Sequence, residues 1–249
     1  MPCAPLWLRC NFLEFIVKFT PSLSTPLPVK AVMIDLDGTL LDTIPDLAVA
    51  ANLMLTELHM PVLPEATIRN FVGKGINNLI ERTLTNSMDG KPDAALFEKA
   101  LPIYDRCYKA VNGKHTTIYP GVKEGLDLLR AQGYPLACVT NKSERFTLPL
   151  LDTVSLSQYF VSVVAGDKLP QKKPDPAQLL YACEQLNVAP IEMLMIGDSI
   201  NDAQAARAAG CPIFCVTYGY NEGHDVQTLD VDAIVASLVE ATRLISKKN

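Results

Sequence analysis

The chain of 249 residues is long enough for one large domain, or for one domain with a second domain inserted into it. Hydrophobic residues make up 49% and charged residues 20% of the sequence, which excludes a disordered, collagen-like or coiled-coil protein. The net charge of −5 supplies no basic surface, so we expect no nucleic-acid partner. A protein of this charge that binds an anion must concentrate positive charge locally.

The first 28 residues differ from the rest of the chain. Apolar residues dominate the beginning, but Arg9, Glu14 and Lys18 interrupt them, so the segment resembles neither a membrane span nor a signal peptide. The proline-rich stretch that ends at Pro28 is typical of a linker. We therefore expect residues 1–28 to form an extension and linker outside the catalytic fold, and we expect no membrane as a partner.

The seven cysteines are scattered and form no Cys-x-x-Cys pair, and the chain has only three histidines. A zinc cluster is therefore not expected. The pattern is typical of reduced thiols, which predicts a cytoplasmic protein. Whether it is a monomer or a homodimer stays open.

From residue 29 onward, short apolar segments that end in polar residues alternate with amphipathic helical segments. The apolar segments are Ala31–Leu36, Leu136–Val139, Val161–Ala165, Met193–Ile196 and Pro212–Val216. Nearly continuous apolar strands that alternate with helices predict an α/β fold with a parallel sheet covered on both faces.

One connection is too long for a simple crossover. About eighty residues of helical character separate the first strand from the turn at Pro120-Gly121, whereas a crossover needs roughly a dozen. We therefore expect residues 46–116 to be an inserted helical cap. Residues 29–45 and 117–249 then form the catalytic core.

Carboxylates follow two of the predicted strands. Asp35 and Asp37 are two apart on an extended segment and project to the same side, and Asp198 follows another strand. Ligands of open α/β sheets bind at the carboxyl ends of the strands, so these three residues are expected to meet. Because carboxylates that meet repel one another, the sequence predicts a divalent cation with oxygen ligands, Mg²⁺. The pair Asp35 and Asp37 alone would also fit an ordinary strand end, and Asp198 alone would also fit a helix cap. The occurrence of both in this order favours a functional site.

Four motifs lie at these strand ends. They are Asp35-Leu36-Asp37-Gly38-Thr39-Leu40-Leu41-Asp42-Thr43, Thr140-Asn141-Lys142, Lys173-Pro174-Asp175-Pro176 and Gly197-Asp198-Ser199-Ile200-Asn201-Asp202. In this order they resemble the signature motifs of the haloacid dehalogenase superfamily, and the helical insertion resembles its C1 cap. The resemblance implies a Rossmann-like core with an inserted α-helical cap.

The resemblance also implies catalytic roles. Asp35 would be the nucleophile that forms an aspartyl-phosphate. Asp37 would protonate the leaving group and then activate water. Thr140 and the amide of Asn141 would bind phosphoryl oxygens, and Lys173 would offset negative charge as well as bind substrate.

The metal and the cap complete the implied site. The Asp35 carboxylate, the Asp37 carbonyl and Asp198 would bind Mg²⁺, and Asp202 would support the metal's water ligands. Lys74, in the cap, is a candidate contact for a substrate carboxylate, although a solvated loop lysine is the favoured interpretation.

The resemblance implies a Mg²⁺-dependent phosphomonoesterase acting on a small phosphorylated metabolite, with 2-phosphoglycolate as the first candidate. The same chemistry on a sugar phosphate, a nucleotide or pyrophosphate is the alternative, and a non-catalytic phosphate-binding regulator is a more distant one. The presence of Asp37 argues against dehalogenation, because displacement of a halide needs no acid on the leaving group.

Overall fold

A computed structural model describes residues 25–248. Its core is a six-stranded parallel sheet with the spatial order β6-β5-β2-β7-β8-β9. The strands are β2 (Ala31–Ile34), β5 (Leu136–Val139), β6 (Ser162–Val164), β7 (Met193–Gly197), β8 (Ile213–Val216) and β9 (Ala233–Val235). The apolar segments expected from the sequence supply five of them, and β9 is an addition at the edge of the sheet.

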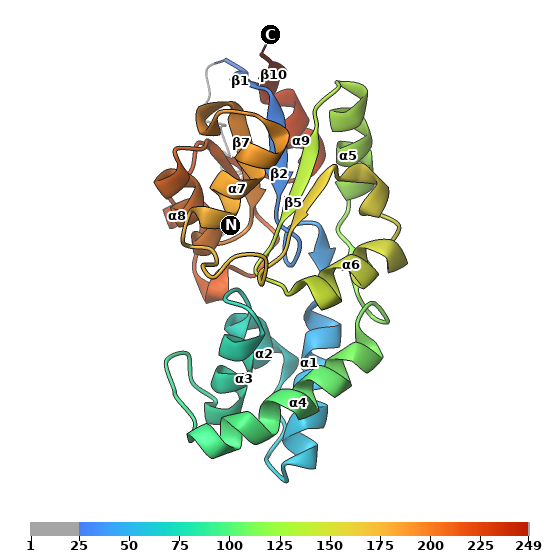
Figure 1. Cartoon of the computed structure of the whole chain (residues 1–249), viewed down its shortest axis with the longest axis vertical. Coiled ribbons are helices and arrows are strands. Elements are labelled where there is room, and N and C mark those ends of the chain that lie inside the picture. Colours follow the sequence, from blue (N-terminus) through green and yellow to red (C-terminus); the bar gives the residue numbers. More distant parts are fainter. Residues whose placement is uncertain (1–24, 249) are drawn as a thin grey trace, which may run out of the picture.

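Two layers of helices cover the sheet (Figure 1). Met33 and Met195 pack on one face with α7 and α8, whereas Ile34 and Ile196 pack on the other face with α5, α6 and α9. Neighbouring residues of one strand thus enter different cores, as the alternation of side chains along a strand requires. The helices are α5 (Val122–Ala131), α6 (Glu144–Thr153), α7 (Ala177–Leu186), α8 (Ile200–Ala209) and α9 (Leu238–Arg243).

Four helices between β2 and β5 form a separate layer below the sheet in Figure 1, which we call the cap. They are α1 (Ile44–Glu57), α2 (Glu65–Phe71), α3 (Ile76–Thr85) and α4 (Ala94–Val111). Buried side chains such as Met54, Ile80 and Tyr104 give the cap its own hydrophobic cluster. The predicted fold class, a parallel-sheet core with an inserted helical cap, is confirmed.

The chain enters and leaves the cap at one place. Strands β3 (Leu41–Asp42) and β4 (Thr117–Ile118) pair antiparallel there. Asp46, fully buried in the first turn of α1, accepts hydrogen bonds from the backbone N–H groups of Gly113 and Thr116 and from the Thr116 hydroxyl. The two connections are therefore fastened to each other.

The start of the core differs from the expected boundary. Strand β1 (Leu27–Val29) pairs in parallel with β10 (Ile245–Lys247), so Leu27 and Pro28 belong to the folded core and not to a linker. The Leu27 N–H donates to the Leu244 carbonyl, and the Lys248 N–H donates to the Val29 carbonyl. Residues 1–24 of the expected extension lie outside the described residues. No helix among residues 25–248 is long and apolar enough to cross a membrane.

Four short 3₁₀ segments complete the described chain. They are η1 (Ser157–Tyr159), η2 (Pro190–Glu192), η3 (Asn221–Gly223) and η4 (Val226–Thr228). Of these, η3 follows β8 and contacts α2 of the cap.

Candidate active site

A cavity is lined by residues of both the core and the cap. The carboxyl ends of β2, β5 and β7 supply its polar wall, and the cap supplies a largely apolar wall. Seven of the eight predicted site residues line it, and the eighth is Lys74. The seven are Asp35, Asp37, Thr140, Asn141, Lys173, Asp198 and Asp202.

Three buried carboxylates form a compact group in this cavity. Asp35, Asp198 and Asp202 each offer an oxygen, and these oxygens lie within 4.8 Å of one another. Asp198 is fixed by the Thr39 hydroxyl, which donates to Oδ1 at 3.0 Å, and by the Tyr220 N–H, which donates to Oδ2 at 2.7 Å. The group has the spacing and the hard oxygen donors that a divalent metal ion needs.

Two glycines make room for Asp198. A Cβ atom at Gly38 would lie 2.4 Å from Asp198 Oδ2, and one at Gly219 would lie 2.1 Å from Asp198 Cβ. Gly38 also has a φ of +93°, which side-chain-bearing residues rarely adopt. Any larger residue at these positions would displace the carboxylate.

The protonation of this group supports a bound cation. Burial raises the pKa of Asp35 well above its ordinary value, although Lys173 opposes the shift. Burial, together with the charge of Asp202, raises the pKa of Asp198 to about 7. Without a cation, the folded protein therefore resists full ionisation of these residues, whereas a divalent ion would compensate the charge. The donor set fits Mg²⁺.

Lys173 lies in the middle of the carboxylates. Its Nζ donates to Asp35 Oδ1 and Asp202 Oδ1, both at 2.7 Å, and to the Val139 carbonyl at 2.8 Å. Burial alone would lower the pKa of Lys173, but Asp202 and Asp35 outweigh burial and raise it above its ordinary value. The lysine therefore stays charged beside the predicted nucleophile.

Asp202 has two contacts of different kinds. Its Oδ2 accepts hydrogen bonds from the N–H and hydroxyl of Ser199, at 3.1 and 2.7 Å, which caps the first turn of α8. Its Oδ1 binds Lys173. The helix-capping interpretation of this motif and the functional one are therefore compatible.

Asp37 has different partners from those of the other carboxylates. The Thr43 hydroxyl donates to its Oδ1 at 2.7 Å, and Lys142 Nζ lies 3.0 and 3.2 Å from its two oxygens. The Asp37 carboxylate is thus not one of the three grouped carboxylates, although the sequence led us to expect it beside Asp35. Lys142 belongs to the motif Thr140-Asn141-Lys142, but no role was predicted for it. Its position two residues after Thr140, at the same strand end, was the available signal.

Thr140 and Asn141 connect the end of β5 to neighbouring segments. The Asn141 side chain accepts a hydrogen bond from the Lys173 N–H and donates to the carbonyls of Lys173 and Gly73. The Asn141 side chain therefore fixes the loop that carries Lys173 and contacts the cap turn. Gln178, which the sequence analysis did not identify, supports the same loop by bonding the Lys173 N–H and the Thr140 carbonyl.

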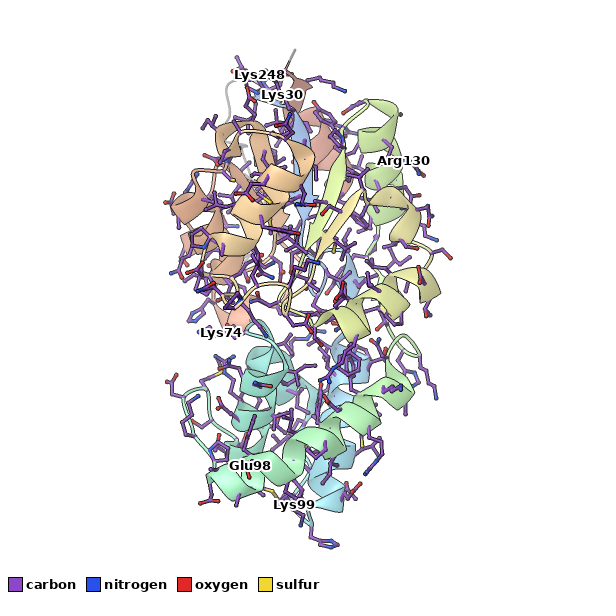
Figure 2. The ribbon with its side chains drawn as sticks, viewed as in Figure 1. Lys30, Lys74, Glu98, Lys99, Arg130 and Lys248 are labelled. Carbon is purple, nitrogen blue, oxygen red and sulfur yellow. The ribbon has the colours of Figure 1, made fainter. Side chains whose placement is uncertain are left out.

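Lys74 lies on the cap turn at the junction with the core (Figure 2), but it does not line the cavity. Its Nζ is 3.8 Å from Glu222 Oε2, and the side chain is 42% exposed. Glu222 itself is buried, forms a 3.1 Å ion pair with Arg82 of α3 and accepts a hydrogen bond from Asn201. Arg82 and Glu222, which join the cap to the core, lie outside the predicted site residues.

The chain is similar to known proteins over most of its length. Residues 32–216 match the family model described as haloacid dehalogenase-like hydrolase. A phosphoglycolate phosphatase of Nitrosospira multiformis is 61% identical over 224 residues, which are 90% of this chain and 99% of that protein. A phosphoglycolate phosphatase of Thiobacillus denitrificans is 53% identical over 224 residues, which are again 90% of this chain and 99% of that protein. A solved structure from Haemophilus somnus, titled a "predicted phosphoglycolate phosphatase", has a TM-score of 0.82 at 32% identity and covers 86% of this chain and 97% of that one.

Proposed function

Because the chain belongs to the haloacid dehalogenase-like hydrolases, we propose that it is a Mg²⁺-dependent phosphatase that hydrolyses 2-phosphoglycolate to glycolate and phosphate. The observation that carries the chemistry is the pairing of the buried Asp35 with Lys173, 2.7 Å apart, beside two further carboxylates. The relatives named phosphoglycolate phosphatase, at 61% and 53% identity, support the substrate.

The first step is attack of an Asp35 oxygen on phosphorus, which forms an aspartyl-phosphate as the bond to the glycolate oxygen breaks. The leaving oxygen takes a proton from Asp37. Lys173 offsets the negative charge that gathers at Asp35 and the phosphoryl group. Thr140 and the backbone N–H of Asn141 bind phosphoryl oxygens, which orients phosphorus toward Asp35.

In the second step, Asp37 accepts a proton from a water molecule, and the resulting hydroxide attacks the aspartyl-phosphate. Phosphate leaves and the Asp35 carboxylate is regenerated. The hydrogen bonds of Asp37 with Thr43 and Lys142 support this role, because they hold its carboxylate at the cavity wall.

The carboxylates of Asp35 and Asp198 and the backbone carbonyl of Asp37 are the proposed metal ligands. Asp202 supports the metal's water ligands. When bound, the ion neutralises phosphoryl charge and acts as a Lewis acid. The pKa of Asp198, about 7, supports metal binding at neutral pH, since the group ionises there at little cost.

The cellular setting is also part of the proposal. We infer a cytoplasmic enzyme that acts as a monomer or a homodimer on its small phosphorylated substrate. The described cysteines, Cys107, Cys138, Cys183, Cys211 and Cys215, are all free, which agrees with a reducing compartment.

The test is release of inorganic phosphate from a panel of phosphorylated metabolites, with Mg²⁺ and then with EDTA. We expect the highest kcat/KM for 2-phosphoglycolate, loss of activity in EDTA and no turnover by Asp35→Asn. A higher kcat/KM for a sugar phosphate, a nucleotide or pyrophosphate would keep the chemistry and replace the substrate. Activity that survives in Asp35→Asn would refute the mechanism.

A further inference from the structure

The charged residues that line the cavity are unevenly distributed. Among residues 25–248, they comprise four carboxylates and two lysines, namely Asp35, Asp37, Asp198, Asp202, Lys142 and Lys173. The cap wall is formed by apolar side chains and glycines, namely Leu47, Val72, Gly73, Gly75, Ile76 and Leu79. An anionic group of a substrate that enters this cavity must therefore find its counter-charge on the core side.

The two lysines are committed to different parts of the cavity. The Lys173 ammonium group donates to Asp35, to Asp202 and to the Val139 carbonyl, so all three of its N–H donors are already used. Lys142 has Asp37 as its only hydrogen-bond acceptor within the described part of the chain. Its ammonium group therefore keeps a donor for a further anion.

The environment of Lys142 holds this ammonium group in place. The residue is 4% exposed, and its Nζ lies 4.9 Å from the centre of the Tyr108 ring of α4. The face of an aromatic ring attracts a cation. Lys142 thus lies between the core carboxylate Asp37 and the Tyr108 ring of a cap helix.

Building on the proposed function, we propose that Lys142 is a specificity-determining residue that binds the carboxylate of the substrate, the end of the molecule opposite the phosphate. A carboxylate buried without a partner is strongly disfavoured, and the four cavity carboxylates would repel it. Two other lysines lie at the rim. Lys74 faces Glu222, and the Lys172 ammonium lies against the cap turn, 3.3 Å from where a Cβ of Gly75 would be.

The test compares two substrates that differ in this group alone. Ethyl phosphate has the same two-carbon alkyl leaving group as 2-phosphoglycolate but no carboxylate, and both need a proton from Asp37. Any effect of Lys142 on Asp37 therefore affects both substrates and cancels in the ratio of their kcat/KM values. Lys142→Met keeps the stem that packs near Tyr108, and Lys142→Gln keeps a donor to Asp37 if the first variant does not fold.

We expect either variant to reduce the preference for phosphoglycolate by about ten- to one-hundredfold, the usual loss for a hydrogen bond to a charged group. Lys142→Arg is expected to retain part of the preference, and Lys172→Met is expected to retain all of it.

An unchanged preference in the Lys142 variants would overturn the inference while the proposed substrate stands. Loss of the preference in Lys74→Met or Lys172→Met, with Lys142→Met unaffected, would assign the carboxylate to the rim and also overturn it. A wild-type protein without any preference for phosphoglycolate would refute both the proposed substrate and the role of Lys142.

Discussion

Both oxygens of the Asp37 carboxylate are in contact with hydrogen-bond donors, Thr43 on one oxygen and Lys142 on both. Replacement by Asn keeps the shape of the side chain but removes its ability to exchange a proton. General acid–base catalysis contributes about 10²–10⁴-fold to a rate. We therefore expect Asp37→Asn to lose a factor of this size on 2-phosphoglycolate, because its alkoxide needs a proton to leave.

The same variant separates the two proton transfers when the substrate is 4-nitrophenyl phosphate. Nitrophenolate leaves without a proton, so Asp35 is still phosphorylated, but Asn cannot activate the water that releases phosphate. We expect a nearly stoichiometric burst of nitrophenol in rapid-quench experiments, with one added phosphoryl group in the intact mass. If no burst appears in a variant that still binds Mg²⁺, Asp37 is not the shared acid and base.

The pKa of Asp198, about 7, links metal binding to pH. Burial, the main cause, favours the protonated form in the metal-free folded protein, whereas the unfolded chain ionises near its ordinary pKa of 3.8. The folded state thus holds an extra proton between pH 3.8 and about pH 7, so the stability that this group contributes falls as the pH rises through that range. Mg²⁺ binds the ionised form of Asp198, so the stability that Mg²⁺ adds increases as the pH rises.

The prediction is that the increase in Tm caused by saturating Mg²⁺ is larger at pH 8 than at pH 6. Thermal unfolding with Mg²⁺ and with EDTA measures it directly. Asp198→Asn is the control, since it should show a small Mg²⁺ effect at both values of pH. An equal Mg²⁺ effect at pH 6 and pH 8 in the wild type would contradict the assignment of Asp198 as a titrating ligand.

At the scale of elements, the strands and their polar ends could be predicted because both signals are local. An apolar strand and the residues that follow it are adjacent in the sequence, as in β2 and Asp35. The ion pairs could not be predicted, because their partners are brought together by folding. Lys142 and Asp37 are 105 residues apart, and Arg82 and Glu222 are 140 apart. The strands β1 and β10 are too short to carry a clear pattern.

The pair between Arg82 and Glu222 joins α3 of the cap to η3 of the core, and both side chains are only 5% exposed. Removing one partner of a buried ion pair typically costs about 3–5 kcal/mol, since the other charge stays buried without compensation. We expect Glu222→Gln to lose stability on this scale in urea unfolding. Glu81→Gln is the matched control, because Glu81 pairs with the exposed Lys91 within the cap and should change stability by at most about 1 kcal/mol. Equal losses in both variants would show that the pair does not fasten the cap to the core.

At the scale of the whole molecule, the site lies between the sheet and the cap, and the hydrophobic cluster of the cap extends to Phe146 and Tyr220 of the core. The sheet presents the predicted catalytic side chains, and the cap closes the cavity with Val72, Ile76 and Leu79. Asp46 fastens the two chain crossings, Asn141 bonds the cap turn at Gly73, and Glu222 pairs with Arg82 of α3. The Asn141 side chain thus contacts both the cap turn, at Gly73, and the backbone of Lys173.

The position of β1 defines where the chain can be shortened. Residues 1–24 contain none of the motifs, so we expect their deletion to leave phosphate release within a few-fold and stability unchanged. Deletion of residues 1–29 also removes the pairing of β1 with β10 and the fully buried Val29. Loss of one buried Val side chain alone removes about 1.5–3 kcal/mol of hydrophobic stabilisation, so this protein should unfold at clearly lower urea concentrations. A large loss of activity in the folded shorter deletion would mean that the first residues contact the cavity or the cap. Equal stability of the two deletions would mean that the β1–β10 pair contributes nothing to the core.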